Sequence, residues 1–146
     1  MHTTLQSLRA RRARGEDNGF TLIELLVVVV IIGILIAIAI PVYLNYQKGS
    51  HDKASESDLR GAISTMEQCY SSVGSYPLDW TPLVGGATGD SATSATCADQ
   101  KISLSAGTTL TVAASGKGYK MTSTNGDGSG KIYVYDSTVG GAVKVQ

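Results

Sequence analysis

Few side chains in this chain of 146 residues are suited to chemistry, and they are scattered. It has two cysteines, Cys69 and Cys97, and two histidines, His2 and His51. Two thiols without a histidine pair nearby make a poor zinc site. No serine or threonine has a base and an oxyanion frame at a recognisable spacing. The sequence therefore predicts no catalytic residues and no cofactor, and we do not expect an enzyme.

One stretch, 125–136, has the residue types of a calcium loop. Oxygen ligands, a glycine and an aliphatic residue fall at the expected offsets: Asn125, Asp127, Ser129, Gly130, Ile132 and Asp136. Only two of these side chains are carboxylates, and 131–135 has the pattern of a strand without flanking helices. We favour a glycine-rich hairpin turn, and calcium binding stays open.

Glu24 is a carboxylate inside a long apolar run. Between Phe20 and Pro41 only Thr21 and Glu24 interrupt the apolar character. A carboxylate inside a membrane helix costs about 3 kcal/mol, so such an acid is expected to have a function and a cationic partner. The alternative is that Glu24 lies close enough to the cytoplasmic interface to stay hydrated.

The element that carries Glu24 is predicted to be a transmembrane helix over 20–44. Its 25 residues would extend roughly 37 Å, enough to cross a hydrocarbon core of ~30 Å with some tilt. A buried core helix is the alternative. A domain this small could hardly surround a helix that is apolar on every face.

The charges on either side of the apolar run predict its orientation. Only Lys48 and Lys53 follow it closely, whereas four arginines precede it: Arg9, Arg11, Arg12 and Arg14. Positive flanks stay in the cytoplasm. We therefore expect the N-terminus in the cytoplasm, a single pass through the cell membrane, and residues 45–146 outside as one extracytoplasmic domain.

An ordinary secretory signal is cut after its apolar core, which is then lost. Here a candidate cleavage site, Gly19 followed by Phe20, precedes the apolar core, so the helix would be kept. The residues GFTLIELL at 19–26, with Gly33 and the segment 38–41 (IAIP), resemble the class III signal of type IV pilins and their pseudopilin relatives. The leader departs from this pattern, because it is long and residues 16–18 are not basic.

This resemblance implies how the chain is processed and assembled. A prepilin peptidase would remove the leader, residues 1–19, by cutting after Gly19, and would methylate the new amino group of Phe20. That amine stays positive and would lie close to Glu24 in sequence. If the amine of an incoming subunit meets Glu24 of its neighbour, both charges are neutralised in low dielectric and the pair sets the axial register of a filament.

Two residues are expected to weaken the apolar helix. Pro41 cannot donate a hydrogen bond to the carbonyl of Ala37, and Gly33 weakens the turn before it. Pilins that resemble this chain are understood to extend between such residues, here over 34–40. A simple kink is the alternative.

The rest of the chain predicts an α+β pilin fold: a long N-terminal helix packed on a small antiparallel sheet. The helix is expected to continue to about Val73, before Gly74 and Pro77 stop it. Its buried face is predicted from an apolar stripe at Leu59, Ile63, Met66, Tyr70 and Val73. Residues 85–98 read as a loop, and a meander is expected from strands at 109–114, 119–124, 131–136 and 142–146.

In an exported protein Cys69 and Cys97 are expected to form a disulfide. Its loop of about 28 residues would add roughly 3 to 4 kcal/mol of stability.

The two halves of the extracytoplasmic part carry net charges of opposite sign. Residues 47–100 carry three basic and seven acidic groups, whereas 101–146 carry five lysines and two aspartates. Opposite signs could bring neighbouring subunits together, or the sheet could offer DNA a surface that includes Lys117 and Lys120.

These observations together predict a structural subunit of a type IV pilus. It would be held by the membrane before assembly and polymerise with copies of itself into an extracellular filament on the cell surface. A pseudopilin of a type II secretion or DNA-uptake system is the alternative, and a membrane-tethered enzyme or ligand-binding module is a third reading.

Overall fold

The computed structural model describes residues 19–78, 83–85, 90–93, 97 and 100–146. Residues 1–18, with the predicted leader arginines and His2, lie outside the described residues, as do 79–82, 86–89, 94–96 and 98–99. The chain divides into two compact units, Met1–Pro41 and Val42–Gln146.

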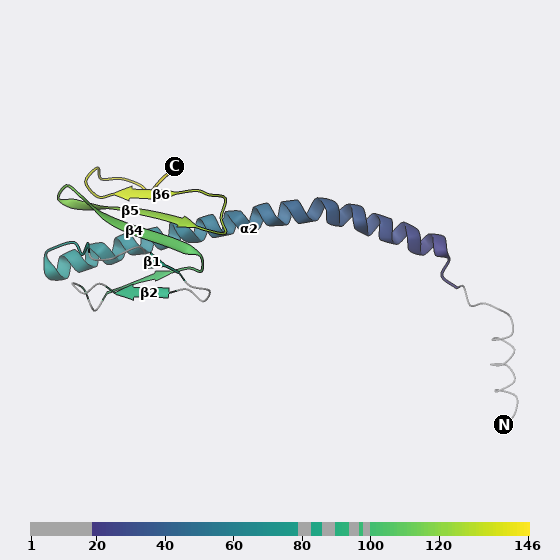
Figure 1. Ribbon diagram of the computed structural model, residues 1–146, viewed down its shortest axis with the longest axis horizontal. Helices are drawn as coiled ribbons and strands as arrows, with labels where there is room; N and C mark the ends of the chain where they lie inside the picture. The colour runs from purple at the N-terminus through teal and green to yellow at the C-terminus, as the bar shows by residue number, and fades with distance from the viewer. Residues whose placement is uncertain (1–18, 79–82, 86–89, 94–96, 98–99) are drawn as a thin grey trace, which may run out of the picture. The chain divides into compact units, whose positions relative to one another are not determined.

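The helix α2 runs from Leu22 to Val73 and contains Pro41 (Figure 1). Its end agrees with the sequence prediction. Gly74 takes a left-handed conformation with φ of 77°, and its N–H donates to the carbonyl of Tyr70 at 2.8 Å. Glycine ends helices in this way because it has no Cβ to clash there.

In the first unit α2 is apolar and exposed on every side. Its most apolar window of 18 residues has a mean hydropathy of 3.4, and none of that window is buried. A helix of this length and composition is sufficient to cross a membrane. The segment 34–40 is helical here, so its extension in an assembly stays a prediction.

The second unit contains a five-stranded antiparallel sheet in the order β1-β4-β5-β6-β7. Its strands are β1 (Leu83–Val84), β4 (Thr108–Ser115), β5 (Gly118–Asn125), β6 (Tyr133–Asp136) and β7 (Lys144–Val145). Figure 1 shows β4, β5 and β6 side by side. The predicted meander is confirmed for β4 to β7, although β6 and β7 are shorter than expected.

The prediction that 85–98 forms only a loop is wrong. β2 (Asp90–Thr93) lies within it and pairs antiparallel with β3 (Lys101–Leu104), with Asp90 opposite Leu104. The sequence DSAT of β2 has no apolar alternation, so it gave no strand signal. A pairing partner outside the segment makes it a strand.

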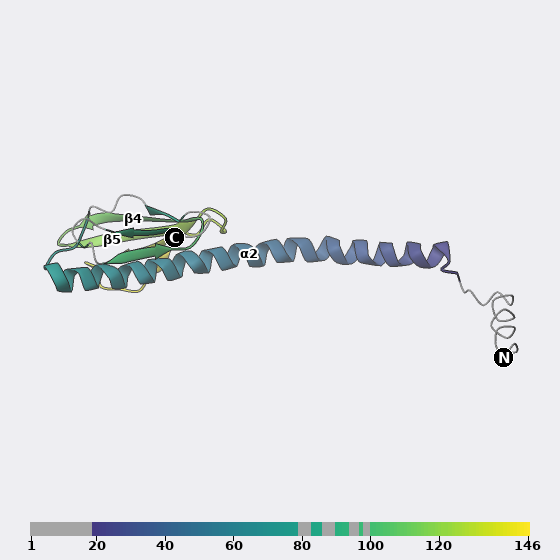
Figure 2. The same ribbon diagram turned by 90° about the horizontal axis from the view of Figure 1, so that it is seen from below.

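The core of the second unit lies between the sheet and the part of α2 that follows Val42, which crosses one face of the sheet (Figure 2). Its fully buried members include Leu59, Met66, Leu110, Tyr119 and Met121.

The predicted buried face of α2 is only partly right. Leu59 and Met66 are buried, but Tyr70 and Val73 are 46% and 49% exposed. The buried face instead follows Asp52, Ser55, Leu59, Ala62, Met66 and Cys69. Steps of three and four residues keep these six on one side of the helix. Two of them are polar, so a search for apolar residues could not trace the whole face.

Candidate functional site

The predicted processing and assembly residues lie at the start of α2, where Thr21 and Glu24 form a capping box. The Thr21 backbone N–H and hydroxyl both donate to Glu24 Oε2, at 2.8 and 2.7 Å. In return the Glu24 N–H donates to the Thr21 hydroxyl at 3.3 Å. The first N–H groups of a helix have no partner within it, and this arrangement satisfies two of them and fixes the helix start.

The capping box was missed by the sequence reasoning, although its signal is present. A threonine followed three residues later by glutamate, just before an apolar run, is the pattern of a capping box. Glu24 is therefore more than an isolated charge, because its carboxylate has a partner within its own chain.

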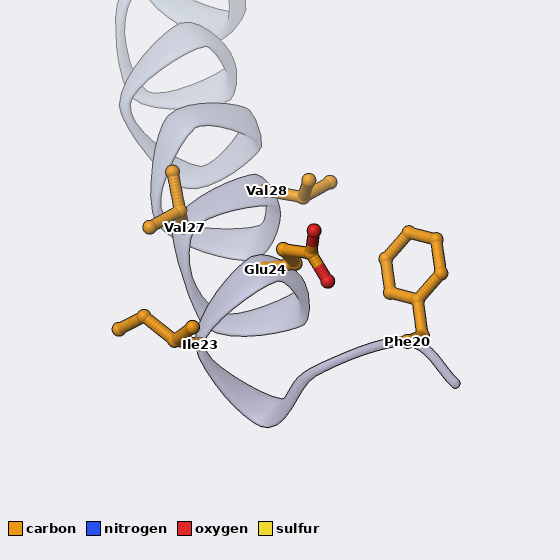
Figure 3. Close-up of a pocket in the computed structure, with 5 residues that line it drawn as sticks. All are labelled: Phe20, Ile23, Glu24, Val27 and Val28. Atoms are coloured by element: carbon orange, nitrogen blue, oxygen red, sulfur yellow. The ribbon is translucent and has the colours of Figure 1, made fainter. Parts of the chain in front are cut away.

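Phe20 and Glu24 border the same open hollow at the helix start (Figure 3). The hollow has a volume of about 390 Å³ and is also lined by Ile23, Val27 and Val28. Figure 3 shows the Glu24 carboxylate and the Phe20 ring on the same side of the helix, whereas Ile23 projects away. Phe20 is 78% exposed, so its backbone and ring are accessible in the isolated chain.

Both Thr21 donors use Oε2 of Glu24. Within the described part of the chain, the other oxygen, Oε1, accepts no hydrogen bond. A carboxylate offers about four acceptor sites, so it can hold the capping box and receive a further cation at once.

Comparison with known proteins agrees with this geometry. A family model described as the prokaryotic N-terminal methylation motif matches residues 16–40. The chain is 38% identical over 69 residues to the type IV major pilin protein PilA of Myxococcus xanthus, covering 47% of this chain and 31% of that one. The N-terminal segment is that of a type IV pilin.

Two further relatives support the identification. The chain is 44% identical over 68 residues to the type IV major fimbrial protein FimA of Dichelobacter nodosus, covering 44% of each chain. It is 40% identical over 67 residues to the type IV major pilin protein PilE of Neisseria gonorrhoeae, covering 44% of this chain and 39% of that one. The chain thus spans less than half the length of each of these three relatives. No solved structure gave a significant match.

The predicted helix breakers do not interrupt α2. A Cβ built on Gly33 would meet nothing within 4 Å among the described residues, so Gly33 is not required by packing inside this chain. Pro41 lies within the continuous helix.

Within the second unit, the turn between β5 and β6 is fastened to α2 by a polar clamp, which we define as Asp52, Ser129 and Lys131. Asp52 is 2% exposed. It accepts hydrogen bonds from the N–H of Ser129 at 2.9 Å and from the Ser129 hydroxyl, and Lys131 Nζ lies 3.5 Å from its Oδ2. Burial alone would raise the pKa of the Asp52 carboxyl, but the hydrogen bonds from Ser129 and Lys131 outweigh it and hold the pKa below its usual value.

Two more polar contacts continue along the same side of α2. Asp58 accepts the N–H and the hydroxyl of Ser105, at 2.7 and 3.0 Å. Between Asp52 and Asp58 along the helix, the hydroxyls of Ser55 and Ser123 lie 2.7 Å apart. These contacts satisfy buried polar groups that would otherwise destabilise the fold.

The residues of the candidate calcium loop are engaged in separate contacts. The Asn125 amide donates to the carbonyl of Ala106 and the hydroxyl of Thr108. Asp136 instead accepts hydrogen bonds from Thr138 and Ser115. Among the described residues, no three His, Cys, Asp or Glu side chains gather as metal ligands.

Cys69 and Cys97 are joined in a disulfide with their Cα atoms 5.9 Å apart. Cys69 is fully buried and Cys97 is 5% exposed. The bond therefore ties the last turns of α2 to the segment before β3 from within the core.

The lysines predicted as a DNA surface are divided between different places. Lys117 lines a groove with Tyr76 and Thr138. Lys120 and Lys144 line another together with Asp136, and Lys131 belongs to the polar clamp. The structure thus gives the predicted DNA contact no single basic groove among these residues.

Proposed function

We propose that this chain is the structural subunit of a type IV pilus. The observation that carries the proposal is the capped N-terminus of α2, with Phe20 and Glu24 beside one hollow, within a segment that matches the N-terminal methylation motif. The relatives named above are major pilins and fimbrial proteins, which favours a pilus subunit over a pseudopilin.

In this proposal a peptidase cuts between Gly19 and Phe20 and the new amine is methylated. The cut leaves the peptide bond between Phe20 and Thr21 intact. The Thr21 N–H is therefore still available to Glu24, and the capping box survives maturation. The product keeps an apolar helix over 20–44 as its membrane anchor, with the domain 45–146 outside the membrane.

Assembly follows from the unsatisfied groups of the mature chain. The methylated amine of Phe20 is a cation that must enter an apolar filament core, and Glu24 Oε1 is an acceptor. Pairing the amine of one subunit with Glu24 of another satisfies both charges in low dielectric, where the attraction is far stronger than in water. Close packing of the apolar helices supplies van der Waals contacts, because lipid tails are already as apolar as the helix surface and leave no hydrophobic drive.

The proposal is tested on sheared surface filaments. They should consist mostly of this chain, and mass spectrometry should place the N-terminus at Phe20 with one added methyl group. In cells lacking the chain, electron microscopy should find no such fibres. Unchanged fibres in those cells, or an intact leader on assembled protein, would contradict the proposal.

A further inference from the structure

Two tyrosines at the start of the second unit are largely exposed. Tyr43 and Tyr46 are 65% and 79% exposed. They are three residues apart on α2, so their rings project from neighbouring positions on one side of the helix. Among the contacts of the described residues, neither hydroxyl takes part in a hydrogen bond.

The polar surface of the second unit begins directly after these tyrosines. A groove of about 450 Å³ is lined by Gln47, Lys48 and His51 of α2, together with Asp127 from the turn after β5 and Leu44 at its apolar end. The side chains therefore change from apolar to polar within about one helical turn, between Leu44 and Lys48.

This arrangement fits the boundary of a lipid bilayer. Tyrosine is enriched at membrane interfaces, because its ring is apolar and its hydroxyl prefers the wet headgroups. Lys48, two residues after Tyr46, can extend its ammonium to the lipid phosphates while its methylenes stay on apolar surface. Tyr43 lies at the end of the apolar run from Phe20 to Leu44 and Tyr46 follows that run by two residues, so both adjoin a surface suited to lipid.

We propose that Tyr43 and Tyr46 form an interfacial anchor that rests in the outer headgroup region of the membrane while the chain is unassembled. Lys48 contacts lipid phosphate just above them. This inference rests on the proposed function only in requiring that the chain is held in a membrane.

The anchor fixes the depth of Glu24. From Glu24 to Tyr43 there are 19 helical steps, which cover about 28 Å at a rise of about 1.5 Å per residue. A bilayer core is ~30 Å thick. With Tyr43 at the outer boundary, Glu24 lies at the cytoplasmic boundary and stays hydrated. The carboxylate is then buried only when the subunit leaves the membrane for a filament, which reconciles the two alternatives that the sequence left open.

Tryptophan fluorescence tests the anchor in the full chain. The single tryptophan, Trp80, is first changed to Phe, and a new tryptophan is then placed by Tyr46→Trp, or by Ile31→Trp as a probe of the bilayer interior. Each protein is reconstituted in phosphatidylcholine vesicles with bromine at defined acyl positions. We expect the probe at 46 to be quenched most by the shallowest bromine and the probe at 31 most by the deepest.

A second arm tests whether the anchor sets the depth. In the Ile31→Trp protein, the double change Tyr43→Ala/Tyr46→Ala should shift or broaden the quenching profile at 31. Tyr70→Ala, which removes an exposed tyrosine near the other end of α2, should leave it unchanged. An unchanged profile in the double variant would overturn the proposal. So would a probe at 46 that is shielded from every brominated lipid, since a protein neighbour would then cover this face.

Alkaline carbonate extraction of native membranes distinguishes failure of the interfacial anchor from failure of the proposed function. If wild-type chain is released with peripheral proteins, it is not held by a membrane helix and both proposals fail. If it stays in the membrane and only the quenching results differ from expectation, the anchor alone is wrong.

Discussion

Thr21 donates two hydrogen bonds to one oxygen of Glu24, at 2.8 and 2.7 Å, and Oε1 of the same carboxylate accepts none among the described residues. The two oxygens can therefore serve two purposes. Oε2 fixes the start of α2 within the chain, and Oε1 is left for the cation that the proposed assembly would bring. This division makes the two roles separable by mutation.

Glu24→Gln should keep membrane insertion, cleavage and the capping box, because an amide oxygen can still accept from Thr21. Filament assembly should fail, since the incoming Phe20 amine would be buried without a counter-ion, and an uncompensated buried charge costs several kcal/mol. The measurement is the ratio of sheared filament to membrane-held protein at equal expression. A normal filament yield would remove the charge pair as the contact that sets the register.

Thr21→Ala is the matched variant, because it removes the cap and keeps the carboxylate. Losing a threonine cap costs about 1 kcal/mol of helix stability. We expect a modest fall in filament yield rather than its loss, and Thr21→Ser should restore it. A loss as complete as that of Glu24→Gln would mean that the cap, rather than the free oxygen, is what assembly needs.

Gly19→Val should block maturation, since a branched side chain beside the scissile bond obstructs the peptidase. The precursor should accumulate in the membrane with its leader attached, as measured by intact-protein mass. Asn18→Val, one residue earlier, is the control and should be processed. Efficient cleavage of Gly19→Val would show that the peptidase does not require a small residue there.

The disulfide should contribute most of the stability that holds the segment before β3. Replacing both Cys69 and Cys97 with alanine should lower the free energy of unfolding by about 3 kcal/mol, because the unfolded chain is no longer closed into a loop. Urea unfolding of the full chain in detergent micelles measures this. Non-reducing peptide mapping of the wild type should recover the linked pair, and free thiols on both residues would contradict the structure.

The polar clamp should make stability fall in acid. The folded-state pKa of Asp52 is below its usual value, so its contribution is present above the unfolded pKa of about 3.9 and is lost as pH falls through the folded pKa. At neutral pH Asp52→Asn should cost about 2 kcal/mol through weaker hydrogen bonds. The difference from wild type should shrink below about pH 4.

Urea midpoints between pH 7 and pH 3 test this. Asp127→Asn serves as the control, because Asp127 is exposed and accepts no hydrogen bond within the described part of the chain. A pH-independent difference between Asp52→Asn and wild type would show that the Asp52 charge does not stabilise the clamp.

Gly128 gives a steric test of the same contact. A Cβ at Gly128 would overlap Asp52 Oδ1, whereas a Cβ at Gly126 meets only the Gly107 carbonyl at 4.0 Å. Gly128→Ala should therefore cost about 1 to 3 kcal/mol, and Gly126→Ala should change the free energy of unfolding by less than about 0.5 kcal/mol. Equal effects in urea unfolding would mean that the turn does not approach α2 this closely.

The sequence by itself determined the features that are local in the chain. The apolar run, the end of α2 at Gly74 and the hairpins among β4 to β7 depend on residues that are neighbours in sequence. The periodicity of apolar residues and the positions of turn residues therefore reveal them. The N-terminal motif is also local, and even the missed capping box lies within four consecutive residues.

Only the tertiary structure decided which side of α2 is buried and that β2 is a strand. Asp52 and Ser55 carry no apolar signal that marks them as buried, because a polar side chain is buried only when it finds hydrogen-bond partners. Their partners, Ser129 and Ser123, are 77 and 68 residues away in sequence. No local pattern records a partner at that distance, and the fold supplies it only when the sheet packs on the helix.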